Sequence, residues 1–174
     1  MLMSETMSPQ PLESGDAMHQ LYETMAGTIE QTTRWDIERL QLAMQAFKCP
    51  MPEAIHHFAP GMYCREFTLP ALHIVVGKIH KHAHFMTALK GKAIVYTEHG
   101  EDLVESGYIT ISQPGAKRVV LAIEDTTFVT IHANPSNTQD LAQIEYEHIE
   151  PESEEYMEAE KKLVEMLKLK GVRQ

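Results

Sequence analysis

The sequence predicts a mainly β protein: one small barrel or sandwich, with a helical arm before it and a helix after it. Between residues 62 and 133, short runs of β-forming residues alternate with turn residues, a texture typical of small all-β domains. Apolar residues recur at helical spacing on both sides of this region. The length of 174 residues suits a single domain with tails.

The N-terminal part is predicted to be a tail followed by a helical arm. Residues 1–15 include three Met and two Pro and have little to bury, so we expect a disordered tail. Residues 16–52 form the arm, because apolar side chains there recur at steps of three or four. Pro50 and Pro52 end the helix, since proline removes a backbone donor and clashes with the preceding turn. The apolar stripe consists of Leu21, Met25, Ile29, Ile37, Leu40, Met44 and Phe47.

Residues 53–135 are predicted to form the β domain, in which turn residues separate the strands. Pro114 and Gly115 fit the two central positions of a type II turn, where glycine supplies the positive φ. We expect strands near residues 62–68, 72–79, 82–89, 92–97, 101–105, 108–112, 116–123 and 127–133.

Residues 136–174 are predicted to be an acidic linker and a C-terminal helix. Ser153 is a candidate N-cap, because its hydroxyl can accept a hydrogen bond from the first turn. Glu154 follows it directly, and Lys168 lies near the expected end. Negative charge at the start and positive charge at the end is the order that the helix dipole favours.

Composition excludes several classes of function. Eight Glu and no Lys or Arg fall between residues 145 and 160, so this segment carries most of the net charge of −10. A nucleic-acid partner is not expected, because such surfaces need clustered basic residues. A membrane partner is not expected either, because no apolar run approaches the roughly 18 residues of a membrane helix and the N-terminus lacks a signal pattern. Cys49 and Cys64 indicate no disulfide framework, which predicts a cytoplasmic protein.

The string "KIHKHAHF", residues 78–85, holds three histidines at alternate positions, His80, His82 and His84. Alternate residues of a strand share one face. On a straight strand, however, these three side chains spread over about 13 Å, whereas a metal accepts nitrogens only about 2.1 Å away. His80 and His84 can therefore bind one ion together only if the strand bends or a turn falls between them.

Two stretches of the β region resemble the motifs of the cupin family. The first family motif is G, five residues, H-x-H, three or four residues, E, six residues and G. The second is G, five residues, P-x-G, two residues, H, three residues and N. The matching stretches are "GKIHKHAHFMTALKG", residues 77–91, and "GYITISQPGAKRVVLAIEDTTFVTIH", residues 107–132. The resemblance implies a single cupin-like jelly-roll barrel, a double-stranded β-helix, at residues 53–135.

A longer match narrows this resemblance. The string "HHFAPGMYCREFTLP", residues 56–70, followed by the two motifs, is similar to uncharacterised cupin-like proteins of bacteriophages and prophages. It implies a phage-encoded protein in the host cytoplasm that acts on a host metabolite or a defence signal. Both helical segments have an apolar stripe and few partners within so small a barrel, so we expect a homodimer.

The sequence departs from the cupin pattern at the metal-binding positions. Counting back from the final glycine of the first motif, the glutamate position falls on His84, and the two histidine positions fall on Lys78 and His80. The histidine position of the second motif falls on Arg118. Two imidazoles and two cations are not an ordinary site for a divalent metal. These four residues instead predict a site for an anionic small molecule, such as a nucleotide or sugar phosphate, because Arg and Lys recognise phosphate and carboxylate groups.

A metal-dependent cupin enzyme is the alternative, with His80, His82, His84 and His132 around a Zn, Fe or Ni ion. His132 enters this set because a jelly roll can bring its last strand near the first motif. A third interpretation is a scaffold protein with an inert barrel, in which Lys78 and Arg118 pair with acidic residues. The candidates for that pairing are Glu66, Glu124 and Asp125. Whether the protein is an enzyme stays open at this point.

Overall fold

The computed structural model describes residues 33–46 and 49–170. The chain divides into two compact units, residues 1–30 and 31–174. The first unit lies outside the described residues, and so do the predicted tail and the first half of the predicted arm. The following description concerns the second unit alone.

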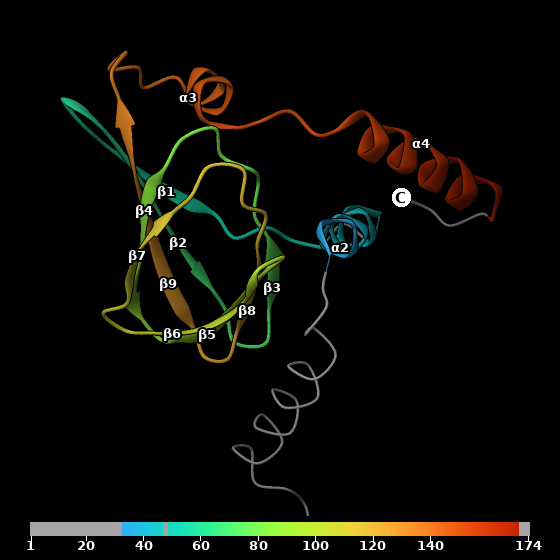
Figure 1. Ribbon diagram of the computed structural model, residues 1–174, viewed down its shortest axis with the longest axis horizontal. Coiled ribbons are helices and arrows are strands. Elements are labelled where there is room, and N and C mark those ends of the chain that lie inside the picture. Colours follow the sequence, from blue (N-terminus) through green and yellow to red (C-terminus); the bar gives the residue numbers. More distant parts are fainter. Residues whose placement is uncertain (1–32, 47–48, 171–174) are drawn as a thin grey trace, which may run out of the picture. The chain divides into compact units, whose positions relative to one another are not determined.

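Two antiparallel sheets form the body of this unit (Figure 1). The first sheet has the strand order β1 (Ala54–Ala59), β2 (Gly61–Leu69), β9 (Thr126–Asn134), β4 (His84–Lys90) and β7 (Ile109–Ser112). The second has the order β3 (Ile74–Val76), β8 (Val119–Ala122), β5 (Lys92–Thr97) and β6 (Gly100–Glu105). Neighbouring strands come from distant parts of the sequence, as in a jelly roll. The prediction of a mainly β jelly-roll barrel flanked by helices is confirmed.

Several strand predictions need correction. β1 was not predicted; it pairs with β2 through a two-residue turn in which Gly61 has a φ of 75°. The strand expected near 72–79 is limited to Ile74–Val76, and the one expected near 82–89 begins only at His84. The type II turn is supported at Gly115, whose φ is 78°. The shortened strands end where the backbone leaves one sheet for the other, a tertiary event that local residue preferences do not contain.

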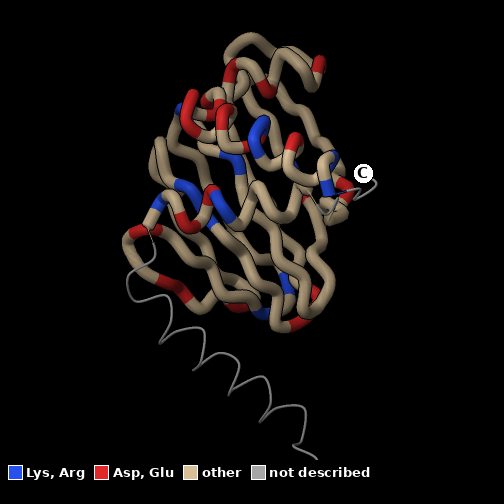
Figure 2. The backbone as a smooth tube through the Cα atoms, turned by 90° about the vertical axis from the view of Figure 1, so that its right-hand side faces the viewer, with Lys and Arg blue, Asp and Glu red and all other residues tan. Residues whose placement is uncertain are grey.

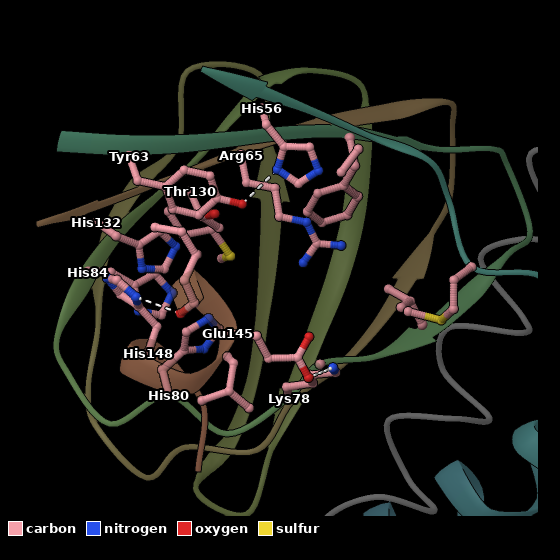
Figure 3. Close-up of a pocket in the computed structure, with 18 of the residues that line it drawn as sticks. His56, Tyr63, Arg65, Lys78, His80, His84, Thr130, His132, Glu145 and His148 are labelled. Carbon is pink, nitrogen blue, oxygen red and sulfur yellow. Dashed lines mark hydrogen bonds and ion pairs between the residues drawn. The ribbon is translucent and has the colours of Figure 1, made fainter. Parts of the chain in front are cut away.

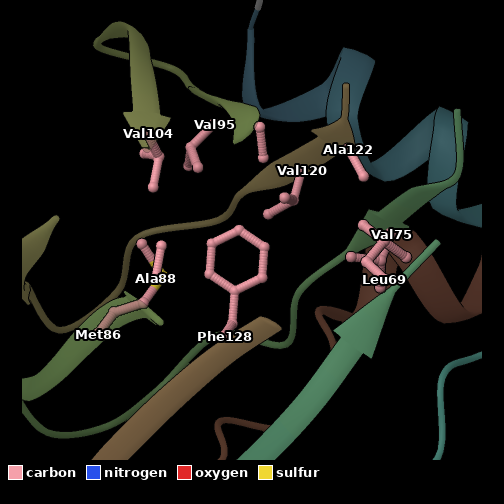
Figure 4. Packing of buried hydrophobic residues seen from close by; sticks show 10 residues of the cluster. Leu69, Val75, Met86, Ala88, Val95, Val104, Val120, Ala122 and Phe128 are labelled. Atoms are coloured by element: carbon pink, nitrogen blue, oxygen red, sulfur yellow. The ribbon is translucent and has the colours of Figure 1, made fainter. Parts of the chain in front are cut away.

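Buried side chains from both sheets form one hydrophobic core (Figure 4). Phe128 of β9 is 1% exposed and packs among Val side chains of the opposite sheet. Ala88, Ala93 and Ala122 are fully buried, and such small residues make room for the larger ones in a densely packed interior. The core fills one end of the space between the sheets and leaves the other end to polar side chains.

Helices α2 (Arg34–Ala46) and α4 (Glu154–Leu169) attach to the barrel through a buried polar cluster. Lys117 is completely buried, lies 3.3 Å from the carboxylate of Glu152 and sits over the ring of Tyr156. The hydroxyl of Tyr156 donates a 2.6 Å hydrogen bond to Gln45 of α2. Ser153 caps α4 as predicted, since its hydroxyl accepts from the backbone N–H of Tyr156.

A third helix, α3 (Leu141–His148), lies in the segment predicted to be only a linker. It begins at Asp140, whose carboxylate accepts from the N–H of Ala142. It ends with His148, whose two ring nitrogens each lie 2.8 Å from a backbone carbonyl, one of Ile144 and one of Ala133 on β9. These contacts fix α3 at the end of β9, over the polar end of the barrel (Figure 1).

Acidic and basic residues both occur on the face of this unit that carries α2 and α4 (Figure 2). On that face Glu158 and Lys162 form an ion pair one helical turn apart on α4. Among the helices that the structure describes, none is long and apolar enough to cross a membrane.

Candidate metal centre and cavity

A cavity of about 430 Å³ lies between the two sheets, and residues of α3 line part of it (Figure 3). Its walls include residues of β1, β2, β4 and β9 from the first sheet and of β3 and β8 from the second, together with α3. The four residues predicted to bind an anionic ligand, Lys78, His80, His84 and Arg118, all line it. Their joint position is a structural finding, and their binding role stays a prediction.

Three histidines converge at one end of this cavity: His80, His84 and His132 (Figure 3). Their ring centroids are 4.1 Å apart for His80 and His84, 4.4 Å for His84 and His132, and 5.2 Å for His80 and His132. One nitrogen from each ring lies within 4.8 Å of the other two. We call these three residues the histidine cluster.

The sheet register explains how two distant histidines meet. β4 and β9 run antiparallel, and Phe85 pairs with Ile131, so His84 and His132 face each other across the same pair of strands. Both point inward, because the side chains next to them along each strand point outward. A jelly roll thus brings the last strand beside the first motif, as the resemblance implied.

His80 joins the cluster because a bend separates it from His84. Residues 81–83 are not part of a strand, and His80 forms an isolated bridge with Ile149, just after α3. Backbone hydrogen bonds hold this bridge: Lys81 donates to His148, and Glu150 donates to Ile79. The bend folds His80 back over His84, so the spread calculated for a straight strand does not apply.

The inclusion of His82 in the predicted metal set is corrected by this bend. His82 is exposed, and it belongs neither to the cluster nor to the cavity wall. The alternation that would have aligned His80, His82 and His84 holds only on a continuous strand, and β4 begins at His84.

The histidine cluster is held in its neutral form. Burial, followed by the neighbouring positive charges, lowers the pKa of His80 to about 3 and that of His132 to about 2. Burial also lowers the pKa of His84. A metal binds neutral imidazole, so near neutral pH these rings have free lone pairs for an ion.

The donor set fits a divalent ion of the zinc, iron or nickel type. Three nitrogens about 2.1 Å from a tetrahedral ion lie about 3.4 Å from one another, somewhat closer than the 4.8 Å limit of the cluster. Small rotations of the rings would close this difference. Among the residues that the structure describes, the buried Nδ1 atom of His80 has no hydrogen-bond partner, which is costly for a polar atom unless something binds it. The residues present therefore fit a bound metal, with the cavity beside it for further ligands.

Aromatic residues support the cluster from two sides. The ring of Tyr63 stacks on His132 at 5.6 Å, and its hydroxyl forms a 2.8 Å hydrogen bond with Nδ1 of His56 on β1. His148 meets His132 edge to face at 5.3 Å. Because both nitrogens of His148 face backbone carbonyls, His148 positions His132 and does not join the ligand set.

Three cationic side chains also line the cavity, and they differ in their pairing. Lys78 lies at the exposed rim and forms an ion pair with Glu145 of α3. This partner is not among the carboxylates proposed for Lys78 from the sequence. Arg118 is partly buried, and burial lowers its pKa. Arg65 of β2 places its guanidinium 5.2 Å from the ring of Phe67.

Sequence reasoning missed three residues of this site, His56, Arg65 and His148. His56 lies on β1, a strand that was not predicted. The position of Arg65 could have been inferred from the sequence, because it alternates with Tyr63 and Phe67 along β2. All three residues line the cavity. His148 had no such signal, because its position depends on α3 folding back over the barrel.

Comparison with known proteins returns solved structures of low sequence identity. A cupin-2 domain protein of Shewanella frigidimarina is 10% identical over 48% of this chain and 80% of its own, with a TM-score of 0.40. A cupin protein of Bacteroides fragilis is 17% identical over 52% of this chain and 84% of its own, with a TM-score of 0.41. Ectoine synthase of P. lautus is 10% identical over 45% of this chain and 60% of its own, with a TM-score of 0.41. No protein-family model matches the sequence, and no curated protein matches it.

Proposed function

We propose that this cupin-like jelly roll is a metal-dependent small-molecule-binding protein. His80, His84 and His132 hold one divalent ion, and the adjoining cavity takes an anionic ligand. The metal site, which the sequence predicted as the alternative, and the predicted anion-binding site are then two parts of one site. The observation that carries this proposal is the convergence of three neutral imidazoles, two buried and one half-buried, whose nitrogens lie within 4.8 Å of one another.

The residues around the ion have different roles. Tyr63 and His148 fix the ring of His132, since they contact it from two sides. The bend at residues 81–83 fixes His80. When bound, the ion supplies Lewis acidity to a ligand oxygen. Three protein ligands leave a coordination position open for that oxygen, as in catalytic rather than structural zinc sites.

Metal analysis of untagged protein tests the proposal. We expect close to one zinc, iron or nickel ion per chain in the wild type, and loss of the ion in His132→Ala. His82→Ala is the matched control, because it removes an exposed imidazole from the same segment and should keep the ion.

Two results would count against the proposal. One is wild-type protein that stays free of metal after dialysis against each of the three ions. The other is equal metal content in His132→Ala and the wild type. Either result would favour the interpretation as an inert barrel.

A further inference from the structure

We infer that the cavity binds an organic carboxylate with an apolar body, and that Arg118 and Arg65 hold its carboxylate group. This inference deepens the proposed function and rests on it for the position of the ligand beside the ion. Arg65 was not among the residues predicted from the sequence, and the ligand class differs from the nucleotide or sugar phosphate expected there.

Arg118 carries a positive charge without a countercharge. It precedes β8, and its backbone is fixed because its carbonyl accepts a 2.9 Å hydrogen bond from Gly77. Among the residues that the structure describes, none forms an ion pair or hydrogen bond with its guanidinium group. The carboxylate that lines the cavity, Glu145, is already paired with Lys78. A partly buried charge without a partner is costly, and a bound anion would remove that cost.

Arg65 adds a second guanidinium from the first sheet. Its side chain extends from β2 into the open space between the histidine cluster and Lys78 (Figure 3). The ring of Phe67 contacts this guanidinium, and no residue in the described part of the chain forms an ion pair or hydrogen bond with it. Guanidinium groups that pack on aromatic rings still present their N–H groups to a planar carboxylate.

Both arginines act on the same place in the cavity. Arg118, just before β8, and Arg65, on β2, both line the cavity at whose end the histidine cluster lies. With a divalent ion on the cluster, the positive charge in this region would rise further. An acidic group between the arginines and the ion is the arrangement that best balances these charges.

The remaining walls favour an apolar ligand body. Two hydroxyl groups line the cavity, those of Thr130 and Tyr63, and the second is bonded to His56. A sugar or nucleotide would bury many hydroxyl groups here without partners, which is unfavourable. The volume of about 430 Å³ is in the range of ordinary small-molecule sites. The apolar wall includes Met51, Val75, Val76, Met86, Val120 and Ile144.

Matched ligands that differ only in charge test this inference. Calorimetric titration would compare benzoate with benzamide, phenylacetate with phenylacetamide, and octanoate with octanamide. Phenyl phosphate replaces the carboxylate by a phosphate on a similar apolar body. Gluconate keeps the carboxylate but carries it on a polar, hydroxylated body. We expect at least one of the three apolar acids to bind at least about tenfold more tightly than its amide and than gluconate, because charged hydrogen bonds to Arg are strong.

Arginine variants locate the acid group. Arg118→Gln should weaken binding of the apolar acid by about 10- to 100-fold, and Arg65→Gln should weaken it in the same direction. Arg39→Gln is the matched control, because Arg39 is exposed on α2 and does not line the cavity. Metal content is measured for every variant, so a change in ion binding is separated from a change in acid binding.

Several outcomes would overturn the inference: no apolar acid binds, the amides bind as tightly as the acids, phenyl phosphate binds more tightly than benzoate, or Arg118→Gln binds like the wild type. Protein that holds an ion but binds no acid would contradict this inference alone. Acid binding that depends on Arg118 in protein without an ion would contradict the metal proposal alone.

Discussion

His80 and His132 make the stability of the protein depend on pH. Their pKa values are lowered from 6.5 to about 3 and about 2, chiefly because they are buried. As the pH falls below 6.5, the unfolded chain therefore takes up protons that the native cluster does not accept. We predict that the free energy of unfolding, measured in a metal chelator, falls between pH 6.5 and about 3 by on the order of a few kcal/mol.

Urea unfolding at a series of pH values checks this prediction. His132→Asn should show a shallower loss of stability with acid than the wild type, because one of the shifted groups is gone. His82→Ala should keep the wild-type slope, since the side chain is exposed. The same slope in His132→Asn and the wild type would mean that the cluster is not held neutral by the fold.

Single residues were only partly predictable. His80 and His84 followed from the motif that holds them, and His132 followed from the resemblance to a jelly roll. The exclusion of His82 did not follow, because period-two alternation assumes a strand without interruption. The bend between His80 and His84 depends on hydrogen bonds to residues 148–150, which are distant in the sequence.

At the scale of elements, Gly91 is predicted to be essential to the turn between β4 and β5. Its φ is 84°, and an added Cβ would lie 2.3 Å from the carbonyl oxygen of Asp125. We predict that Gly91→Ala lowers the free energy of unfolding by at least about 2 kcal/mol. Thermal or urea unfolding measures this loss.

Gly107→Ala is the control for that substitution. Gly107 has a similar φ of 87° but nothing within 4 Å of an added Cβ. Gly107→Ala should lower the free energy of unfolding by only about 1 kcal/mol, which is the cost of a positive φ for a residue with a Cβ. Equal losses in the two variants would mean that the close approach at Gly91 does not limit the turn.

The ion pair between Lys117 and Glu152 is predicted to hold α2 and α4 on the barrel. Glu152→Gln leaves the ammonium group of Lys117 buried without a carboxylate. We expect a loss of about 2–3 kcal/mol in the free energy of unfolding, because removing one partner of a buried pair is costly. Glu158→Gln breaks an exposed pair with Lys162 and should cost less than about 0.5 kcal/mol. A loss in Glu152→Gln as small as in Glu158→Gln would disprove the role of the buried pair.

Elements with strong local signals were predicted, and elements defined by tertiary contacts were not. The cap at Ser153 and the central strands carried capping and turn residues that act locally. β1 went unrecognised, although Ala54, His56 and Phe58 alternate with more exposed residues. α3 has eight residues and a predominantly polar surface, so its sequence resembled the surrounding acidic linker.

For the whole molecule, the fold class could be predicted and the ligand could not. Closely spaced strands and turn glycines indicated a barrel, and the order of the two motifs indicated a jelly roll. The ligand depends on side chains that meet only after folding, above all Arg65 from β2 and Arg118 from the segment before β8. The homodimer, the cytoplasmic location and the phage origin stay predictions.

X-ray absorption at the metal edge of the purified protein tests the histidine centre most directly. The spectrum should show an ion with about three imidazole nitrogens near 2.0–2.1 Å, and these should disappear in His132→Ala but persist in His82→Ala. A spectrum without imidazole scattering, or one that His132→Ala leaves unchanged, would contradict the assignment of His80, His84 and His132 as the metal ligands.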